Sequence, residues 1–373
     1  MICCYIIECK WGNLVMRLLT VVGARPQFIK AAVVSHKLRK THSEILIHTG
    51  QHYDYNMSEQ FFEELNIPKP DYNLGISGGT HGQMTGKMLI SIEEVLLKET
   101  PDVLLVYGDT NSTLAAALAA AKLHIPVCHV EAGARTHCLE NPEEMNRICT
   151  DHLSSLLMVS TQSGMSELEK EGLSDRAVLV GDPMFDAFRE YSGKVSVDNM
   201  KLTSLDGESI SVPVKYCYMT CHREENTATD ENLTEILKAM NELGMPVIYP
   251  VHPRNKERAR RIKQKSGFEN VILTEPVGYL ESIALVNGAE LIVTDSGGLQ
   301  REAFFAKKKC VTVLDFVVWP ETMIDNRNVL AKPDCSDILE KISLQQQIKD
   351  EYMPFGDGKA AVHIVEEIES FLD

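Results

Sequence analysis

Two stretches decide the fold of this chain, Leu104-Leu105-Val106-Tyr107-Gly108-Asp109-Thr110-Asn111-Ser112-Thr113 and Pro126-Val127-Cys128-His129-Val130-Glu131-Ala132-Gly133-Ala134-Arg135. Each contains a short apolar run and a glycine near a carboxylate, as expected for neighbouring strands of a parallel sheet. Residues 112–123 are rich in alanine with apolar residues at helical spacing, and Thr110 or Asn111 can cap this helix. The pattern predicts a strand–helix–strand crossover that brings Asp109 and Glu131 to the ligand-binding edge of an open sheet.

Length and composition indicate a soluble globular protein. The 373 residues are enough for two domains, each with a full core. Hydrophobic residues make up 44% and charged residues 24%, and no apolar run approaches the ~18 residues of a membrane span. The 37 Lys and Arg against 53 Asp and Glu give a net charge of −16, which argues against nucleic acid or an anionic membrane as the main partner. An anionic small substrate would need a local basic pocket.

The ten cysteines are scattered, without the spacing of a disulfide framework or a zinc ribbon, as is typical of reduced cytoplasmic proteins. Cys217 and Cys221 have no second pair beside them, so we predict no metal site. Residues 1–15 lack the basic start and continuous apolar core of a signal peptide. Because residues 17–22 form the first convincing strand, we expect Met16 to be the natural start.

The first half of the chain repeats a strand followed by a helix. The strand at 17–22 leads through Gly23-Ala24-Arg25-Pro26 into a helix reaching about Lys40, which places Arg25 and Lys30 near the junction. A lone glycine at this turn is no dinucleotide-binding fingerprint. Further strands are predicted at 44–49, 156–160 and 177–181, and further helices at 57–65, before Pro101 and from Pro142, whose first turn carries Glu143 and Glu144.

The second half resumes the alternation after a polar segment at 192–213. The strands predicted at 214–219 and 246–250 each deliver a histidine and an arginine to a carboxyl edge, in His222-Arg223 and His252-Pro253-Arg254. The strand at 291–294 runs into Asp295-Ser296-Gly297-Gly298, where two glycines at a helix start leave backbone N–H groups open to phosphate oxygens.

These elements predict an α/β protein with two Rossmann-like domains whose parallel sheets face a central cleft. We expect the first domain at residues 16–191, a linker at 192–213, a nucleotide-binding domain at 214–355 and a C-terminal helix at 356–373 that can pack back on the first domain. Carboxylates from the first domain would face basic groups and a phosphate cradle from the second. Such a cleft suits an activated substrate linked through a diphosphate.

Several short motifs are shared with one enzyme family. They are Gly23-Ala24-Arg25-Pro26 with Lys30, Tyr107-Gly108-Asp109-Thr110, His129-Val130-Glu131-Ala132-Gly133, Pro142-Glu143-Glu144 with Asn146-Arg147, His222-Arg223-Glu224, His252-Pro253, Asp295-Ser296-Gly297-Gly298 with Glu302, and Gly356-Asp357-Gly358-Lys359-Ala360. Together, from Met16 nearly to the C-terminus, the chain resembles the non-hydrolysing UDP-N-acetylglucosamine 2-epimerases and their close relatives. The resemblance implies a fold of the GT-B type and a cytoplasmic homodimer.

The resemblance also implies a reaction, the conversion of UDP-N-acetylglucosamine to UDP-N-acetylmannosamine without a nicotinamide cofactor or a metal. UDP leaves in an elimination that gives 2-acetamidoglucal, and then adds back. The C2 proton is weakly acidic, so a carboxylate must be held against it while cations and helix N-terminal amides stabilise the departing diphosphate. Carried over by motif, the catalytic candidates are Asp109, Glu131, Glu143 and His222, and the substrate-binding candidates are Arg25, Lys30, Arg135, Arg147, His252, Ser296, Gly297, Gly298 and Glu302.

Three positions depart from the family's pattern. Gln51-His52-Tyr53-Asp54 lacks the second glutamine of Gln-His-x-Gln, and residues 75–86 contain no arginine, so we expect no activating second UDP-sugar site and simple hyperbolic kinetics. Trp319-Pro320-Glu321 replaces Arg-Pro-Glu and removes one cation expected near the diphosphate. The sequence Pro26-Gln27-Phe28-Ile29-Lys30 resembles that of a subgroup that acts on UDP-2,3-diacetamido-glucuronic acid, which is the alternative substrate.

Other activities share parts of this pattern. A hydrolysing 2-epimerase would release the sugar after attack by water. A GT-B glycosyltransferase would keep the fold and the nucleotide site but need a surface for an acceptor. A non-catalytic nucleotide-sugar sensor would need no acid or base at Asp109 and Glu131, so the paired carboxylates favour epimerisation.

Overall fold

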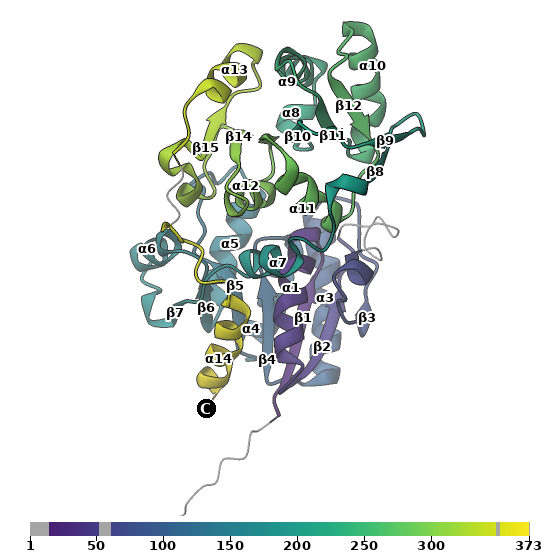
Figure 1. Cartoon of the computed structure of the whole chain (residues 1–373). Helices are drawn as coiled ribbons and strands as arrows, with labels where there is room; N and C mark the ends of the chain where they lie inside the picture. The colour runs from purple at the N-terminus through teal and green to yellow at the C-terminus, as the bar shows by residue number, and fades with distance from the viewer. Residues whose placement is uncertain (1–14, 52–60, 348–350, 373) are drawn as a thin grey trace, which may run out of the picture.

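The computed structural model describes residues 15–51, 61–347 and 351–372, and it contains two parallel sheets, one in each half of the molecule (Figure 1). The first sheet has seven strands in the order β3-β2-β1-β4-β5-β6-β7, and the second has six in the order β12-β11-β10-β13-β14-β15. All strand pairs in both sheets are parallel. The predicted α/β architecture with two parallel sheets is confirmed.

The central strand β4 is apolar and buried along its whole length because helices cover both faces of the first sheet. Leu104 and Val106 pack in the cluster that includes α3 (His81–Glu99) and α4 (Asn111–Lys122), whereas Leu105 and Tyr107 pack in the cluster that includes α1 (Arg25–Leu38). The strands are β1 (Arg17–Val22), β2 (Ser43–His48), β3 (Tyr72–Asn73), β4 (Val103–Tyr107), β5 (Val127–Ala132), β6 (Leu156–Val159) and β7 (Ala177–Leu179).

The crossover predicted from the deciding stretches is present as β4, α4 and β5. The side chain of Thr110 caps α4 by accepting a hydrogen bond from the Thr113 N–H at 3.3 Å. β4 pairs with β5 in parallel, with Leu104 opposite Val127. Asp109 therefore lies two residues past the end of β4, and Glu131 is the penultimate residue of β5. Both are at the same edge of the sheet.

The second sheet is covered in the same way. The helices α9 (Asp230–Glu242), α10 (Lys256–Ser266) and α13 (Cys335–Ser343) pack on one face, and α11 (Tyr279–Gly288) and α12 (Gly297–Phe305) pack on the other. The strand predicted at 214–219 begins only at Cys217, because Val214 is 96% exposed and lies outside the sheet. The strands are β10 (Cys217–Thr220), β11 (Val247–Pro250), β12 (Val271–Thr274), β13 (Leu291–Thr294), β14 (Lys309–Val313) and β15 (Asn328–Ala331).

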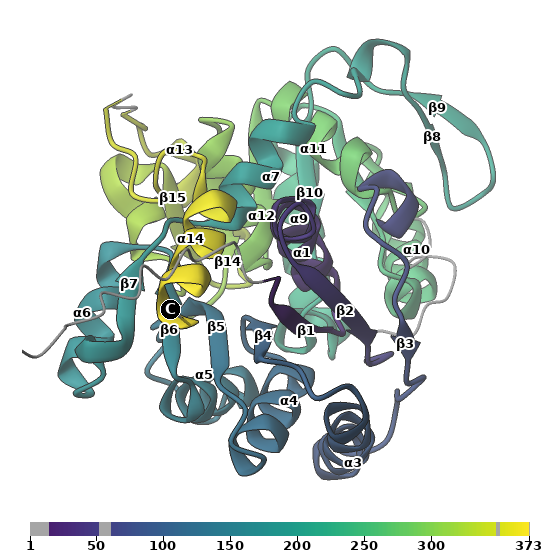
Figure 2. The same cartoon turned by 90° about the horizontal axis from the view of Figure 1, so that it is seen from below.

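The segments that join the two halves also carry structure. Residues 192–213 contain a short antiparallel hairpin, β8 (Lys201–Thr203) and β9 (Ser209–Ser211). The preceding helix α7 (Pro183–Tyr191) contacts both α1 and α12. The last helix, α14 (Ala360–Leu372), returns to the first half and packs against α1, α7 and β6, as the view from below shows (Figure 2).

Some predictions fall partly outside the described residues. Of the helix predicted at 57–65, residues 61–65 are described; residues 61–64 are helical and Leu65 lies in a turn. The expected start at Met16 concerns residues 1–14, which are not described. Within the described ranges, no helix combines the length and apolar character that a membrane crossing requires. In the same ranges, no three His, Cys, Asp or Glu side chains gather as a metal site would require.

Candidate active site

A cleft of about 770 Å³ lies between the carboxyl edges of the two sheets. One wall comes from the segments after β1 and β4, from the end of β5 and from the start of α5 (Pro142–Leu153); the other comes from the segments after β10 and β11 and from the start of α12. All predicted site residues except Arg135 line this cleft, namely Arg25, Lys30, Asp109, Glu131, Glu143, Arg147, His222, His252, Ser296, Gly297, Gly298 and Glu302.

The Asp109 carboxylate is held by α5. Arg147 Nη2 lies 2.6 Å from Asp109 Oδ2, and Arg147 Nη1 lies 3.0 Å from Glu144 Oε2. The Asn146 side-chain amide donates to the Asp109 backbone carbonyl at 2.9 Å. The Asp109 side chain keeps 23% of its surface exposed. Arg147 and Asn146 therefore fix a carboxylate whose exposed part faces the cleft.

Glu131 occupies an irregularity in β5. Its φ is +73°, a left-handed conformation that is rare for residues other than glycine, and the register with β6 shifts between Val130 and Ala132. Its Oε2 lies 2.6 Å from Lys30 Nζ and 2.6 Å from Arg301 Nη1. Burial alone would raise the pKa of Glu131, but the two cations lower it to about 2. Glu131 is therefore an ionised and immobilised carboxylate at neutral pH.

Sequence reasoning missed two residues of this group, Arg301 and Asp182. Arg301 Nη1 lies 2.7 Å from Asp182 Oδ2, and its guanidinium carbon lies 4.1 Å from the centroid of the Trp319 ring. Asp182 caps α7 by accepting a hydrogen bond from the Met184 N–H at 2.9 Å. The sequence does contain two local signals: Asp182-Pro183 is typical of a helix start, and Arg301 follows the glycine pair by three residues. Neither signal showed that the two side chains meet between the sheets.

Glu143 differs from the other two carboxylates in its electrostatics. It lies in the first turn of α5, and its Oε2 is 3.7 Å from Arg223 Nη2. Burial in the cleft and the neighbouring Asp109 carboxylate raise the pKa of Glu143. A raised pKa makes the protonated form of a carboxyl group more available for proton donation. Glu143 is therefore suited to donate a proton.

His222 is oriented by a buried carboxylate. Its Nδ1 lies 3.1 Å from Asp295 Oδ1, and the backbone N–H groups of His222 and Arg223 both donate to Asp295 Oδ2 at 2.8 Å. Although burial alone would raise it, these interactions lower the pKa of Asp295 to about 2. Because Nδ1 faces Asp295, Nε2 is the ring nitrogen left for a ligand in the cleft.

The start of α12 and two arginines bring groups that can bind an anion into the cleft. Ser296 caps this helix, with its Oγ accepting from the Leu299 N–H at 3.4 Å, and the first N–H groups of a helix have no partner within the helix. Arg25 and Arg254 line the same cleft; the Arg25 guanidinium lies over the Phe61 ring, and Arg254 Nη2 donates to the His222 backbone carbonyl. At the rim, His252 Nδ1 accepts from the Arg254 N–H at 3.4 Å.

Glu302 is buried on α12, one turn beyond the glycine pair. Burial raises the pKa of Glu302 to about 7, while the nearby Arg301 and Arg25 oppose that shift. The carboxyl group thus changes its charge in the physiological range.

We expect Glu302→Gln to stabilise the protein at pH 8 and to leave its stability nearly unchanged at pH 4.5. The pKa of Glu302 rises from 4.5 to about 7 in the folded protein, so the stability that its protonation contributes is complete below pH 4.5 and lost as the pH rises through 7. A pKa shift of this size corresponds to a change of as much as about 3 kcal/mol in the free energy of unfolding. Thermal melting of both proteins between pH 4.5 and 8 measures it; a Tm difference that does not change with pH would show that Glu302 ionises normally.

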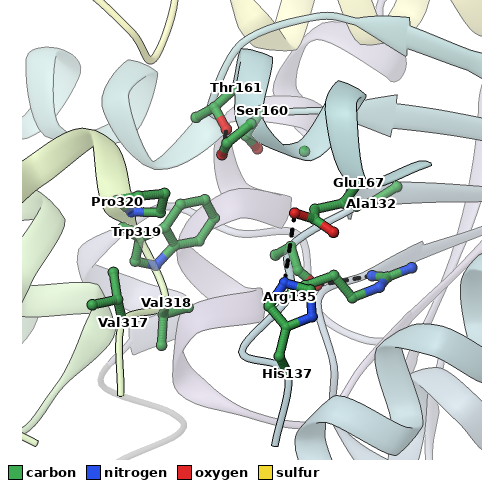
Figure 3. A pocket seen from close by; sticks show the side chains of 14 residues that line it. Ala132, Arg135, His137, Ser160, Thr161, Glu167, Val317, Val318, Trp319 and Pro320 are labelled. Carbon is green, nitrogen blue, oxygen red and sulfur yellow. Dashed lines mark hydrogen bonds and ion pairs between the residues drawn. The ribbon is translucent and has the colours of Figure 1, made fainter. Parts of the chain in front are cut away.

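Arg135, predicted to bind the substrate, is not among the residues that line the cleft. Arg135 Nη2 lies 2.7 Å from Asp151 Oδ2, and Nε lies 2.7 Å from Glu171 Oε1, with only 2% of the side chain exposed. Arg135 lines a separate pocket of about 210 Å³, across which the Trp319 ring lies (Figure 3). Two carboxylates of the chain already neutralise this cation, and these contacts connect the loop after β5 to Asp151 and Glu171.

We expect this chain to lack the activating UDP-sugar site of some relatives. The structure describes only part of the region where that site would lie. Gln51 lines the cleft, and its Oε1 accepts hydrogen bonds from Ser112 Oγ at 2.7 Å and from the Ser112 N–H at 3.1 Å. His52, Tyr53 and Asp54 lie outside the described residues. Hyperbolic kinetics therefore stay a prediction.

Comparisons with known proteins identify the family of this chain. The sequence matches the model of the family described as UDP-N-acetylglucosamine 2-epimerase over residues 36–369. It is 47% identical over 355 residues to the UDP-N-acetylglucosamine 2-epimerase homolog of Methanococcus maripaludis, with 94% of this chain and 99% of that protein covered. It is also 47% identical over 361 residues to the UDP-2,3-diacetamido-2,3-dideoxy-D-glucuronate 2-epimerase of Pseudomonas aeruginosa, with 94% and 99% covered. A crystal structure of the UDP-GlcNAc 2-epimerase of Methanocaldococcus jannaschii in complex with UDP-GlcNAc and UDP matches with a TM-score of 0.85 at 38% identity, covering 95% of this chain and 100% of that chain.

Proposed function

The chain belongs to the UDP-N-acetylglucosamine 2-epimerase family, and we propose that it inverts C2 of UDP-N-acetylglucosamine to give UDP-N-acetylmannosamine. The observation that carries this proposal is the composition of the cleft. Asp109, Glu131 and Glu143 line one wall, and the N-terminus of α12 with its glycine pair lies on the other. A sugar with an acidic C–H bond next to a diphosphate leaving group matches that arrangement.

The proposed reaction is an elimination followed by an addition. A carboxylate takes the proton from C2, the electron pair of the C2–H bond forms the C1–C2 double bond, and the C1–O bond breaks as UDP leaves. A proton then returns to the opposite face of C2, and UDP adds back to C1. We assign Asp109 as a base, because Arg147 and Asn146 hold it toward the cleft, and Glu143 as a proton donor, because its pKa is raised.

The departing diphosphate needs positive charge that is already in place. We assign this role to Arg25, to the N–H groups of Gly297 and Gly298, and to His222, whose ring Asp295 holds. Glu302 would contact the ribose, and His252 would lie on the nucleotide side. Each assignment follows from position on the cleft wall and from the family's motifs.

A second candidate substrate is UDP-2,3-diacetamido-glucuronic acid. Two observations favour it: the 47% identity to the Pseudomonas aeruginosa enzyme, and the run Pro26-Gln27-Phe28-Ile29-Lys30, which resembles the subgroup that acts on this sugar. Both substrates carry UDP on C1 and an acetamido group on C2, so the same carboxylates would act on either.

Separate incubations with the two UDP-sugars, analysed by ion-exchange chromatography and mass spectrometry, test the proposal. We expect UDP-N-acetylmannosamine to form with its UDP intact. Conversion of UDP-2,3-diacetamido-glucuronic acid without conversion of UDP-N-acetylglucosamine would establish the second candidate. Release of free N-acetylmannosamine and UDP would instead indicate a hydrolysing enzyme, and no product from either sugar would favour a transferase or a sensor.

We further propose that the protein is a homodimer that uses the outer face of α3. Ile90 and Leu97 are each 60% exposed and are seven residues apart, which places them on one face of the helix. We expect light scattering to give twice the 41.7 kDa of the chain, and the pair of changes Ile90→Glu and Leu97→Glu to give the single mass. Val214→Glu, at an exposed apolar residue away from α3, should leave the mass unchanged; a monomeric wild type would refute the proposal.

A further inference from the structure

Trp319 stands where the family's pattern places an arginine, and this change has a structural counterpart. The Trp319 side chain is buried at the cleft, just before the short 3₁₀ helix η4 (Pro320–Asn326). The guanidinium carbon of Arg301 lies 4.1 Å from the centroid of its ring. A guanidinium on residue 319 would have to share this space with that of Arg301, and two like charges so close repel each other. Positions 301 and 319 therefore provide room for one cation.

The partners of Arg301 connect the two halves of the molecule. Arg301 belongs to α12 beside the second sheet, one turn beyond the glycine pair at the anion site. Its Nη1 contacts Glu131 Oε2 at 2.6 Å and Asp182 Oδ2 at 2.7 Å, and both carboxylates belong to the first half. Lys30 completes a buried group of two cations and two carboxylates. This group has no net charge only while Arg301 is present.

We propose that Arg301 is a positioning residue for the epimerisation: it supplies the cation that position 319 has lost, and it holds Glu131 ionised and correctly oriented. The inference rests on the proposed function. Through α12, Arg301 also links the helix end that would bind the diphosphate to the carboxylate of the first domain. The nucleotide and the acid–base groups are thus connected by one side chain.

The charges around Glu131 determine what removal of Arg301 would do. Lys30 comes from α1, Arg301 and Glu302 from α12, Asp182 from the start of α7, and Arg147 from α5. Without Arg301, Glu131 keeps Lys30 as its contacting cation and gains an uncompensated Asp182 nearby. Its pKa should then rise, because a buried carboxylate with fewer cations is protonated more readily. The acid limb of the turnover profile would move to higher pH.

Four variants test the proposal, with kcat, KM and the pH profile measured on the substrate that the wild type converts. We expect Arg301→Met to lower kcat ~10²-fold, to change KM little and to shift the acid limb to higher pH. Arg301→Lys should leave the acid limb of the pH profile at its wild-type position. Adding Trp319→Arg to Arg301→Met should restore at least about one tenth of the lost turnover, because it returns a guanidinium to the same space. Arg261→Met, at an exposed arginine of α10, serves as the matched control and should change none of these values.

Two results would overturn the proposal. One is an Arg301→Met protein that folds but keeps the wild-type pH profile and kcat. The other is a double variant no more active than Arg301→Met alone. If Arg301→Met does not fold, Trp319→Arg alone decides: it should lower Tm and turnover by placing two guanidinium groups together, and a fully active and stable protein would refute the shared cation site. A wild type without turnover would contradict the proposed function instead, so the two failures are distinguishable.

Discussion

Asp109→Asn is expected to lower kcat by ~10²–10⁴-fold, the usual cost of removing a positioned acid or base. The amide keeps the shape of the carboxylate and can still accept the hydrogen bond from Arg147, which now lies 2.6 Å from Asp109 Oδ2. It cannot take a proton from C2. Steady-state turnover gives kcat, and calorimetry with UDP should show an affinity close to that of the wild type, because the proposed reaction assigns Asp109 to the sugar and not to the nucleotide.

The matched control for this prediction is Asp175→Asn. Asp175 lies in an exposed turn just before β7, outside the residues that line the cleft. It should have wild-type turnover. An Asp109→Asn protein that turns over at the wild-type rate would remove Asp109 from the mechanism, and one that loses UDP binding as well would indicate a structural role.

Glu131→Gln should have an effect of similar size on turnover and an additional effect on stability. Its carboxylate neutralises both Lys30 and Arg301, each at 2.6 Å. Breaking a buried ion pair by removing one partner typically costs about 3–5 kcal/mol, because an uncompensated charge stays behind. We therefore expect a clearly lower Tm together with a kcat reduced ~10²–10⁴-fold.

Two measurements separate the catalytic from the structural loss at Glu131. Turnover should be measured well below the Tm of the variant, and UDP binding should confirm that the nucleotide site is intact. Glu131→Asp keeps the charge but shortens the side chain, so we expect it to recover stability more than turnover. Equal recovery of both would mean that Glu131 only neutralises its neighbours.

The fold could be predicted from the sequence because each element carries its own local signal. The apolar run at 103–107 has no polar face, as a strand buried on both sides requires, and alanine-rich residues capped by Thr110 continue it as a helix. The glycine pair after β13 likewise indicated the helix start that faces the cleft. For the same reason, nearly all the expected site residues line one cleft: parallel strands deliver their C-terminal residues to one edge.

The remainder of the site depends on contacts between distant segments, which no local pattern encodes. The left-handed φ of Glu131 and its pair of cations follow from the meeting of β5, α1 and α12. Arg135 lies in the same stretch as Glu131, yet after the turn at Gly133 its side chain contacts Asp151 and Glu171. Arg301 directly precedes Glu302 in the chain, but its contacts depend on Asp182, more than a hundred residues earlier.

Proton NMR of UDP-N-acetylglucosamine with the protein in heavy water tests the central claim most directly. If a carboxylate removes the C2 proton during elimination and the medium supplies the proton that returns, the H2 signal should disappear as UDP-N-acetylmannosamine carrying deuterium at C2 accumulates. The same measurement with UDP-2,3-diacetamido-glucuronic acid shows which of the two sugars the protein converts. An epimerised product that keeps its original hydrogen at C2, or an H2 signal that persists unchanged with both sugars, would contradict this account.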